Sequence, residues 1–395
     1  MNRRHDIDAL RAIAFAFLIL YHLCMLYVAE WPWHLKSSYV FEALQLPMMF
    51  MNRWRMDLIF LISGISTAFL MRGKASGNFL GQRSKRLLWP LLIGIVVVVP
   101  IQPYCQGVAN GLVEPGFLTF LGHYYTGYAW PAKAFDGWEH GFTWNHLWYL
   151  AYLWCYTALL LLLRPVFESR PMRAIEQAFN NLRGARLRIW PAIPLLIATC
   201  LLQLHFEDTG DLIHDWYRHA IYFTVFVYGW WLGRSEALWP ELARLRKISL
   251  AAALAVFAMY IAIVRNQPET LPPWLLLIIW ILRIAYIWLS LATVLGWGHA
   301  LLNRHFRWLP WATEAVKPWY ILHQSLIVLL AYWLVPLKLG AMVELPLVLL
   351  GTVAGCWSLT ALIKRSRWLR PAFGLKNPSR AAMNKVGSTR AAAAE

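Results

Sequence analysis

The first apolar stretch of the chain, 7–28, contains two residues that a lipid-buried helix does not hold without a reason: Arg11 and His22. Eleven positions are about three helical turns, so both side chains leave a helix on one face, roughly 16 Å apart along its axis. A neutral imidazole can take the proton of an attacking hydroxyl near neutral pH, and a fixed guanidinium can hold an anion or polarise a carbonyl. Asp8 is the expected ion-pair partner of Arg11. The alternative is that Asp8 and Arg11 form a purely structural ion pair and that His22 is a hydrogen-bonded helix histidine without a catalytic role.

Further polar side chains stand in or beside other apolar stretches. A charge near the bilayer centre costs about 2.5–3.5 kcal/mol on insertion scales, so such residues are candidates for function. They are Arg55, Asp57, His146, Arg283 and His323. By expected depth, Arg11 and His323 lie toward the cytoplasm, Arg283 lies near mid-membrane, and the others lie toward the outside. A polar path through a helix bundle accounts for them, and it suits either solute transport or transfer of a chemical group.

Composition sets the fold class that positions these residues. The chain has 395 residues, of which 59% are hydrophobic and only 14% charged, which is typical of a polytopic membrane protein. We expect an all-α bundle of about ten transmembrane helices, each near the ~20 residues that cross a hydrocarbon core. The predicted spans are 7–28, 56–71, 87–104, 146–163, 189–206, 217–233, 248–264, 273–297, 318–337 and 345–363.

The distribution of basic residues predicts the orientation of these helices. Most of the 37 lysines and arginines fall in segments on the same side as the N-terminus, so both termini are expected in the cytoplasm. The net charge of +17 then follows mostly from topology and does not indicate nucleic-acid binding. Arg83 and Arg86, in the predicted inner loop 72–86, could bind phosphates, although positive-inside bias alone also explains them.

The rest of the chain predicts little further chemistry. The five cysteines are scattered through apolar segments, so neither a disulfide framework nor a metal site is expected. The first apolar stretch lacks the pattern of a cleaved signal, so we expect it to stay attached. Residues 1–370 are interpreted as one transmembrane domain, and 371–395 as a basic, Ala-rich tail that is disordered. The long outer loop 105–145 is rich in aromatics that could stack on sugar rings or form an interfacial belt.

Several segments together show a resemblance to a known family. Asp8 to Arg11, ten intervening residues and His22 resemble the Arg-x10-His signature of the acyltransferase-3 family, membrane enzymes that transfer acyl groups to surface and periplasmic glycans. Similar family landmarks follow in the right order at Phe60–Gly64, Gln82–Pro90, Asn145–Leu150 and Tyr320–His323. Within the family, Trp54–Asp57, His146–Trp148 and Ile321–His323 look most like the glucan succinyltransferases of the glucan biosynthesis protein C type.

The resemblance implies an inner-membrane O-acyltransferase that moves an acetyl or succinyl group from cytoplasmic acyl-CoA to a hydroxyl of an extracytoplasmic glucan or other glycan. His22 would be the general base or carry the acyl group transiently, assisted by Arg11 and His323. Substrate binding is expected from Asp8, Arg55, Asp57, His146 and Arg283, with either arginine able to pair with a succinyl carboxylate, and donor binding from Arg83 and Arg86. Acyl-CoA enters as a substrate, no bound cofactor is expected, and the oligomeric state stays open.

A transporter or flippase for an anionic or acylated glycan is the strongest rival from another class, because it would use the same polar path without making bonds. Secondary transporters often contain internal repeats. No clear repeat relates 7–163 to 189–363. A structural assembly role is a third possibility, but it leaves the buried charges unexplained.

Overall fold

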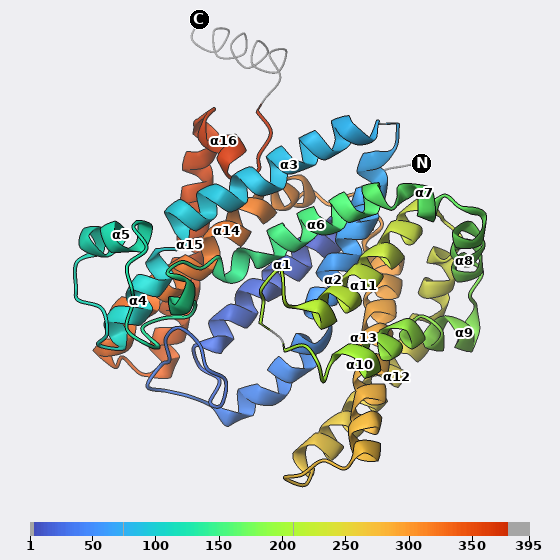
Figure 1. Cartoon of the computed structure of the whole chain (residues 1–395), viewed down its shortest axis with the longest axis horizontal. Helices are drawn as coiled ribbons and strands as arrows, with labels where there is room; N and C mark the ends of the chain where they lie inside the picture. The colour runs from blue at the N-terminus through green and yellow to red at the C-terminus, as the bar shows by residue number, and fades with distance from the viewer. Residues whose placement is uncertain (1–3, 74, 208, 378–395) are drawn as a thin grey trace, which may run out of the picture.

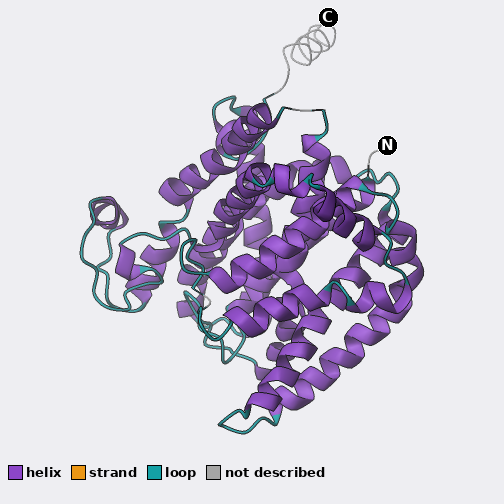
Figure 2. Ribbon diagram, turned by 45° about the vertical axis from the view of Figure 1, so that its right-hand side comes forward, coloured by secondary structure: helices purple, strands orange, loops and turns teal. Residues whose placement is uncertain are grey.

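The computed structural model describes residues 4–73, 75–207 and 209–377, and within them the chain is a bundle of helices (Figures 1 and 2). Its described part contains no named strand, only an isolated parallel bridge between Val28 and Phe41. The all-α membrane bundle expected from composition is therefore confirmed.

Each predicted span coincides with one helix or with helices that follow one another in the sequence. They are α1 (His5–Met25), α2 (Gln45–Met71), α3 (Ser76–Ile93) continued by a π-helical turn (Gly94–Val98) and α4 (Ile101–Ala109), α6 (Trp148–Leu162), α9 (Gly184–Ile189) with α10 (Ala192–Leu202), α11 (Trp216–Arg234), α12 (Trp239–Arg265), α13 (Pro273–Leu302), α14 (Leu309–Leu334) and α15 (Ala341–Arg365).

The remaining helices lie between these spans or after them. They are α5 (Phe117–Tyr125), α7 (Arg164–Phe167), α8 (Arg170–Asn180), α16 (Leu369–Ala372) and the short turns Glu42–Leu44, Trp138–His140, Asn145–Leu147 and Val335–Leu337. Among the described residues, eight helical segments are long and apolar enough to cross a membrane; α6 and α11 are helical but are not among the eight. The chain is a multi-pass membrane protein.

Four helices, α2, α3, α12 and α14, begin well before their predicted starts. α2 begins at Gln45, so Arg53 and Arg55 lie in a helix and not in an outer loop. Hydropathy excludes the turn with Arg53 and Arg55 from the predicted span because both residues are charged. In the structure both arginines line an internal pocket and do not face lipid. α12 begins at Trp239. α14 begins at Leu309 and contains Pro318, which was its predicted first residue.

The basic segment 72–86 is also mostly helical, which corrects its assignment as an inner loop. α3 begins at Ser76. Phe79, Arg83 and Leu87 are spaced four residues apart and are all buried, at 3%, 9% and 1% exposure. Residues at this spacing share one helical face, so the segment is an amphipathic helix that packs on the bundle.

Contacts near the ends of the helices join segments that the charge pattern places on the same side. At one end Arg4 pairs with Glu236 at 3.2 Å and Lys364 pairs with Glu314 at 2.7 Å. At the other end His34 lies 2.9 Å from Asp136. α16 lies at the top of Figure 1, and the loop between α12 and α13 at the bottom. We call these the inner and outer ends; that the inner end is cytoplasmic stays a prediction.

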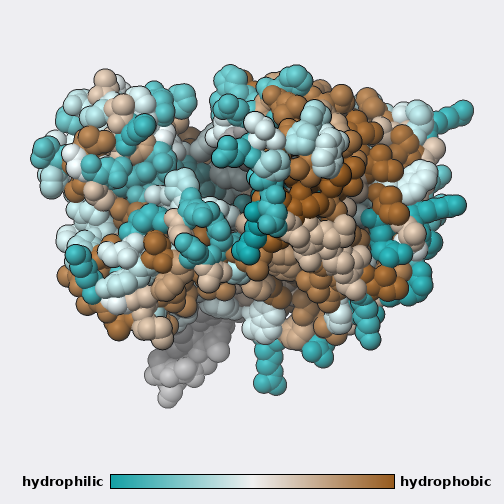
Figure 3. Space-filling model, turned by 90° about the horizontal axis from the view of Figure 1, so that it is seen from below, coloured by the Kyte–Doolittle hydropathy of each residue, from teal (hydrophilic) through white to brown (hydrophobic). Residues whose placement is uncertain are grey.

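The surface carries many exposed large hydrophobic side chains, as lipid contact requires. Figure 3 shows hydrophobic residues covering a broad area on the right of the molecule and hydrophilic residues gathered on the left. The most exposed include Leu118, Leu162, Trp333 and Met342. At the inner end the chain remains packed after α16, with Phe373 and Leu375 buried. Residues 378–395, most of the predicted tail, lie outside the described residues.

Candidate active site

A pair of histidines from α1 and α14 forms the centre of the site. Nδ1 of His22 lies 2.8 Å from Nε2 of His323, and the two rings are stacked with centroids 5.1 Å apart. The depth expected for His323 is wrong: it was placed toward the cytoplasm, away from His22. Because α14 begins at Leu309, His323 lies about four turns into the helix and reaches the level of His22.

The hydrogen bonds of His323 fix the proton positions of both rings. Its Nδ1 lies 3.0 Å from the carbonyl oxygen of Trp319 and 2.8 Å from that of Tyr320. A carbonyl only accepts, so Nδ1 of His323 carries the proton and Nε2 of the neutral ring is an acceptor. Nδ1 of His22 must therefore donate to it. The lone pair of His22 is then on Nε2, which has no hydrogen-bond partner among the described residues.

His22 faces a small cavity near the outer end. Its volume is about 50 Å³, enough for a few water molecules. The cavity is lined by Phe15, Leu18, His22, Arg55, Met56, Ile59, His146, Trp148, Tyr149 and Tyr320. An unprotonated imidazole nitrogen with the remaining ring nitrogen hydrogen-bonded is the arrangement that general base catalysis needs.

His146, which the sequence analysis assigned to substrate binding, lines the same cavity but has both ring nitrogens engaged. Nε2 donates to the carbonyl oxygen of Ile321 at 3.2 Å, which leaves Nδ1 to accept from Nε2 of Gln102 at 3.4 Å. The hydroxyl of Tyr320 donates to the His146 carbonyl. The ring centroid of His146 is 6.5 Å from that of His22. These bonds hold His146 in place and leave its ring nitrogens no free proton acceptor.

A buried polar network extends from His146 to the outer loop. Gln324 donates to Gln102 at 2.9 Å and contacts Nε2 of His34 at 3.0 Å, and Nδ1 of His34 lies 2.9 Å from Asp136. Burial raises the pKa of Asp136. A hydrogen bond from His34, electrostatic attraction to His34 and a hydrogen bond from Gln106 together bring that pKa below its usual value. Sequence reasoning missed this network, although glutamines at 102 and 324 in apolar helices were an available signal.

A cluster of cations lies on the inner side of the histidine pair. Arg11 donates to Asp8 at 2.6 Å, as predicted. Arg83 interacts electrostatically with Arg11 and Arg86, and Lys317 on α14 interacts with all three. Lys317 was not among the site residues expected from the sequence. Arg11 does not line the histidine cavity. Tyr149 does line it, and its hydroxyl lies 2.5 Å from that of Ser63. Tyr149 also interacts electrostatically with Arg11 and Arg83.

Arg55, Asp57 and Arg283 line a second, larger cavity of about 240 Å³ at the outer end. The guanidinium of Arg55 stacks on Tyr21 at 3.5 Å from the ring centroid. Arg283 donates to the hydroxyl of Tyr217 at 2.8 Å and to Gln203. Arg55, Met56 and Trp148 line both cavities, so the two are neighbours.

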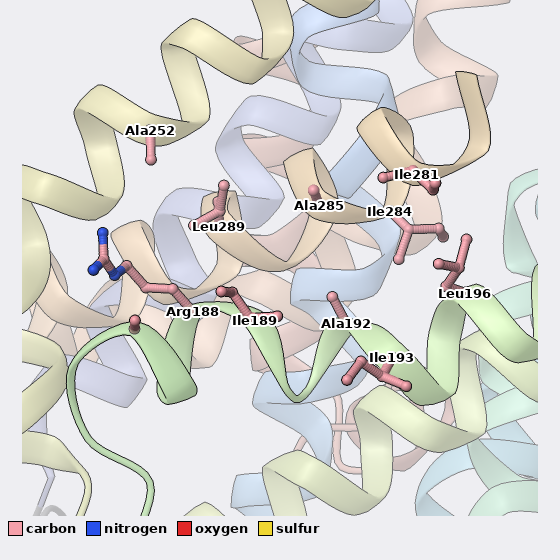
Figure 4. Close-up of a pocket in the computed structure, with 11 residues that line it drawn as sticks. Arg188, Ile189, Ala192, Ile193, Leu196, Ala252, Ile281, Ile284, Ala285 and Leu289 are labelled. Atoms are coloured by element: carbon pink, nitrogen blue, oxygen red, sulfur yellow. The ribbon is translucent and has the colours of Figure 1, made fainter. Parts of the chain in front are cut away.

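The largest of these cavities, about 330 Å³, lies elsewhere, between α9, α10, α12 and α13 (Figure 4). Its lining side chains are alanine, leucine and isoleucine apart from Arg188, so it offers neither a general base nor a nucleophile. Within the described residues, His, Cys, Asp and Glu side chains form no group of three that could hold a metal ion. The described side chains near the two histidines offer a general base, His22, and several cations that can bind organic anions.

The His22–His323 bond predicts a positioning role for His323. In the His323→Phe variant His22 loses the acceptor that keeps its proton on Nδ1, so we expect kcat to fall by about 100-fold. The amide oxygen of His323→Gln can accept the same bond and should restore part of kcat. A merely structural role predicts equal losses in both variants when kcat is measured on protein that elutes as a single folded species.

Residues 4–361 match a family model described as an acyltransferase domain, whose name is acyltransferase-3. No curated protein and no solved structure gives a match.

Proposed function

The chain belongs to the acyltransferase-3 family, since its match covers nearly the whole sequence, and on that premise we propose that it transfers an acyl group across the membrane. The donor is a cytoplasmic acyl-CoA, and the acceptor is a hydroxyl of an extracytoplasmic glycan. The observation that carries the proposal is that His22 lines a cavity while its Nδ1 lies 2.8 Å from Nε2 of His323, which leaves Nε2 of His22 as the proton acceptor.

In the proposed reaction His22 is the general base. Its Nε2 takes the proton of the acceptor hydroxyl while the hydroxyl oxygen attacks the thioester carbonyl. The tetrahedral intermediate collapses with cleavage of the carbon–sulfur bond, and the proton on His22 passes to the leaving thiolate of CoA. Arg55 on the cavity wall supplies a positive charge for the oxyanion, a role that the sequence analysis gave to Arg11.

The inner cation cluster of Arg11, Arg83, Arg86 and Lys317 is proposed to bind the phosphates of the donor. Charge-assisted hydrogen bonds from arginine suit phosphate oxygens, and lysine adds a further positive charge. Tyr149 connects this cluster to the histidine cavity, so the acyl-bearing arm of CoA would extend toward the outer end between α1, α3 and α14. This arrangement separates donor binding from the chemical step.

Substitution of Arg86 tests whether donor binding is separate from the chemical step. We expect Arg86→Gln to raise KM for acyl-CoA about tenfold with a small effect on kcat, because a phosphate contact is lost. KM for the corresponding acyl-pantetheine, which lacks the nucleotide, should not change. Lys85→Gln is the matched control, since Lys85 is exposed on the same helix turn. Equal shifts for both donors would contradict phosphate binding at Arg86.

The narrower proposal concerns the substrates and the membrane. The segments at 54–57, 146–148 and 321–323 resemble glucan succinyltransferases, which supports an acetyl or succinyl donor, a glucan acceptor and the cell inner membrane as the location. The direct test is CoA-thiol release by protein in liposomes, given a panel of acyl-CoAs with and without glucan. Release that is selective for one donor and needs the glucan identifies both substrates, whereas release that ignores the glucan overturns that acceptor.

A further inference from the structure

The cavity beside the histidine site is strongly cationic. Four arginines and two aspartates are among the described residues that line it: Arg53, Arg55, Arg218, Arg283, Asp57 and Asp215. Burial raises the pKa of Asp215 to about 6, despite the hydrogen bond from Tyr152 that opposes the shift. Positive charge therefore exceeds negative charge in this lining. We call this cavity the arginine pocket.

Three of these arginines have buried N–H groups for which the described residues provide no acceptor. Nε of Arg53, Nε and Nη1 of Arg55 and Nε of Arg283 are buried without a hydrogen-bond partner. None of the three guanidinium groups forms an ion pair with a residue in the described part of the chain. A buried charged donor without an acceptor is costly, and native proteins rarely retain several together without water or a ligand to satisfy them.

The same side chains are held in fixed positions. Arg55 is stacked on Tyr21, Arg283 is bonded to Tyr217, and Arg53 lies 5.6 Å from the ring centroid of Tyr260. They come from α2 and α13, which are spans of the bundle. A rigid set of donors with free N–H groups is preorganised for the oxygen atoms of a carboxylate or a phosphate.

We propose that the arginine pocket binds an anionic group carried by one of the two substrates while the reacting atoms of that substrate lie at His22. The inference rests on the transfer reaction proposed above. The two cavities share Arg55, Met56 and Trp148, so one molecule can occupy both. The anion is either the carboxylate at the far end of a dicarboxylic acyl group or a carboxylate or phosphate on the acceptor glycan.

Paired substrates distinguish the two sources. Succinyl-CoA and butyryl-CoA have acyl chains of equal carbon number and differ in the terminal carboxylate, and a glucan can be compared with the same glucan carrying phosphate groups. We expect wild-type kcat/KM to favour one charged member, and Arg283→Gln and Arg53→Gln each to lower that preference about tenfold or more. Arg265→Gln, at the exposed outer end of α12, should keep it. Loss of the donor preference assigns the anion to the acyl group, and loss of the acceptor preference assigns it to the glycan.

A binding measurement separates this inference from the transfer reaction. Calorimetry with monomethyl succinate and with glucose 6-phosphate, against methyl butyrate and glucose, requires no turnover. Binding of a charged probe that Arg283→Gln weakens about tenfold and Arg283→Lys partly restores supports the pocket, even if no acyl group is ever transferred. A protein that transfers acyl groups without any charge preference and binds neither anion overturns the inference while leaving the transferase proposal intact.

Discussion

The His22→Gln variant should release CoA about 100- to 10,000-fold more slowly than the wild type in the presence of donor and acceptor. The amide of glutamine can still donate a hydrogen bond to Nε2 of His323, so the packing of α1 on α14 is largely kept. It has no nitrogen lone pair basic enough to take a proton from a hydroxyl. Thiol release from acyl-CoA by protein in liposomes, followed with and without glycan, measures the loss.

Two comparisons make this result specific. His205→Gln removes an exposed histidine after α10 and should retain the wild-type rate. Wild-type protein given donor without acceptor, quenched and analysed by mass spectrometry, should carry no acyl group if His22 is only a base; an acylated His22 would instead show a covalent intermediate. A folded His22→Gln protein that keeps the wild-type rate would remove His22 from the mechanism.

The one-face relation of Arg11 and His22 illustrates what the sequence could predict. Helical periodicity is local, so it correctly placed both residues on α1 and paired Arg11 with Asp8. The partner of His22 depended instead on where α14 begins. Proline at 318 is a good first-turn residue, but the bundle tolerates it inside the helix, and that shift in the start moved His323 to the level of His22.

The arginine pocket shows a second limit. Hydropathy averages a stretch of residues and does not record whether its polar side chains face lipid or the interior. The turn that contains Arg53 and Arg55 therefore read as a loop, although it is the outer part of α2. Likewise Gln102 and Gln324 are uncharged and match no motif, and their contact joins α4 to α14, which only the folded bundle brings together.

The largest effect on stability is expected at the crossing of α2 and α11. An added Cβ at Gly64 would lie 2.0 Å from the carbonyl oxygen of Phe226, and one at Gly229 would lie 2.0 Å from that of Leu61. Both obstacles are backbone, so the helices themselves must separate. Because α2 carries Arg55 and Asp57 and α11 carries Tyr222 on the wall of the arginine pocket, separation also opens the site. Gly64→Val should therefore cost about 3 kcal/mol or more.

Thermal unfolding in detergent, followed by the fraction that remains monodisperse after heating, measures this loss. We expect Gly64→Val to lower the midpoint by many degrees and to abolish acyl transfer in whatever protein remains folded. Gly81→Val is the matched control, since nothing lies within 4 Å of a Cβ built at Gly81 in α3, and its midpoint should stay near that of the wild type. Equal midpoints for Gly64→Val and Gly81→Val would mean that α2 and α11 do not cross this closely, and the arginine pocket between them would then have to be rebuilt.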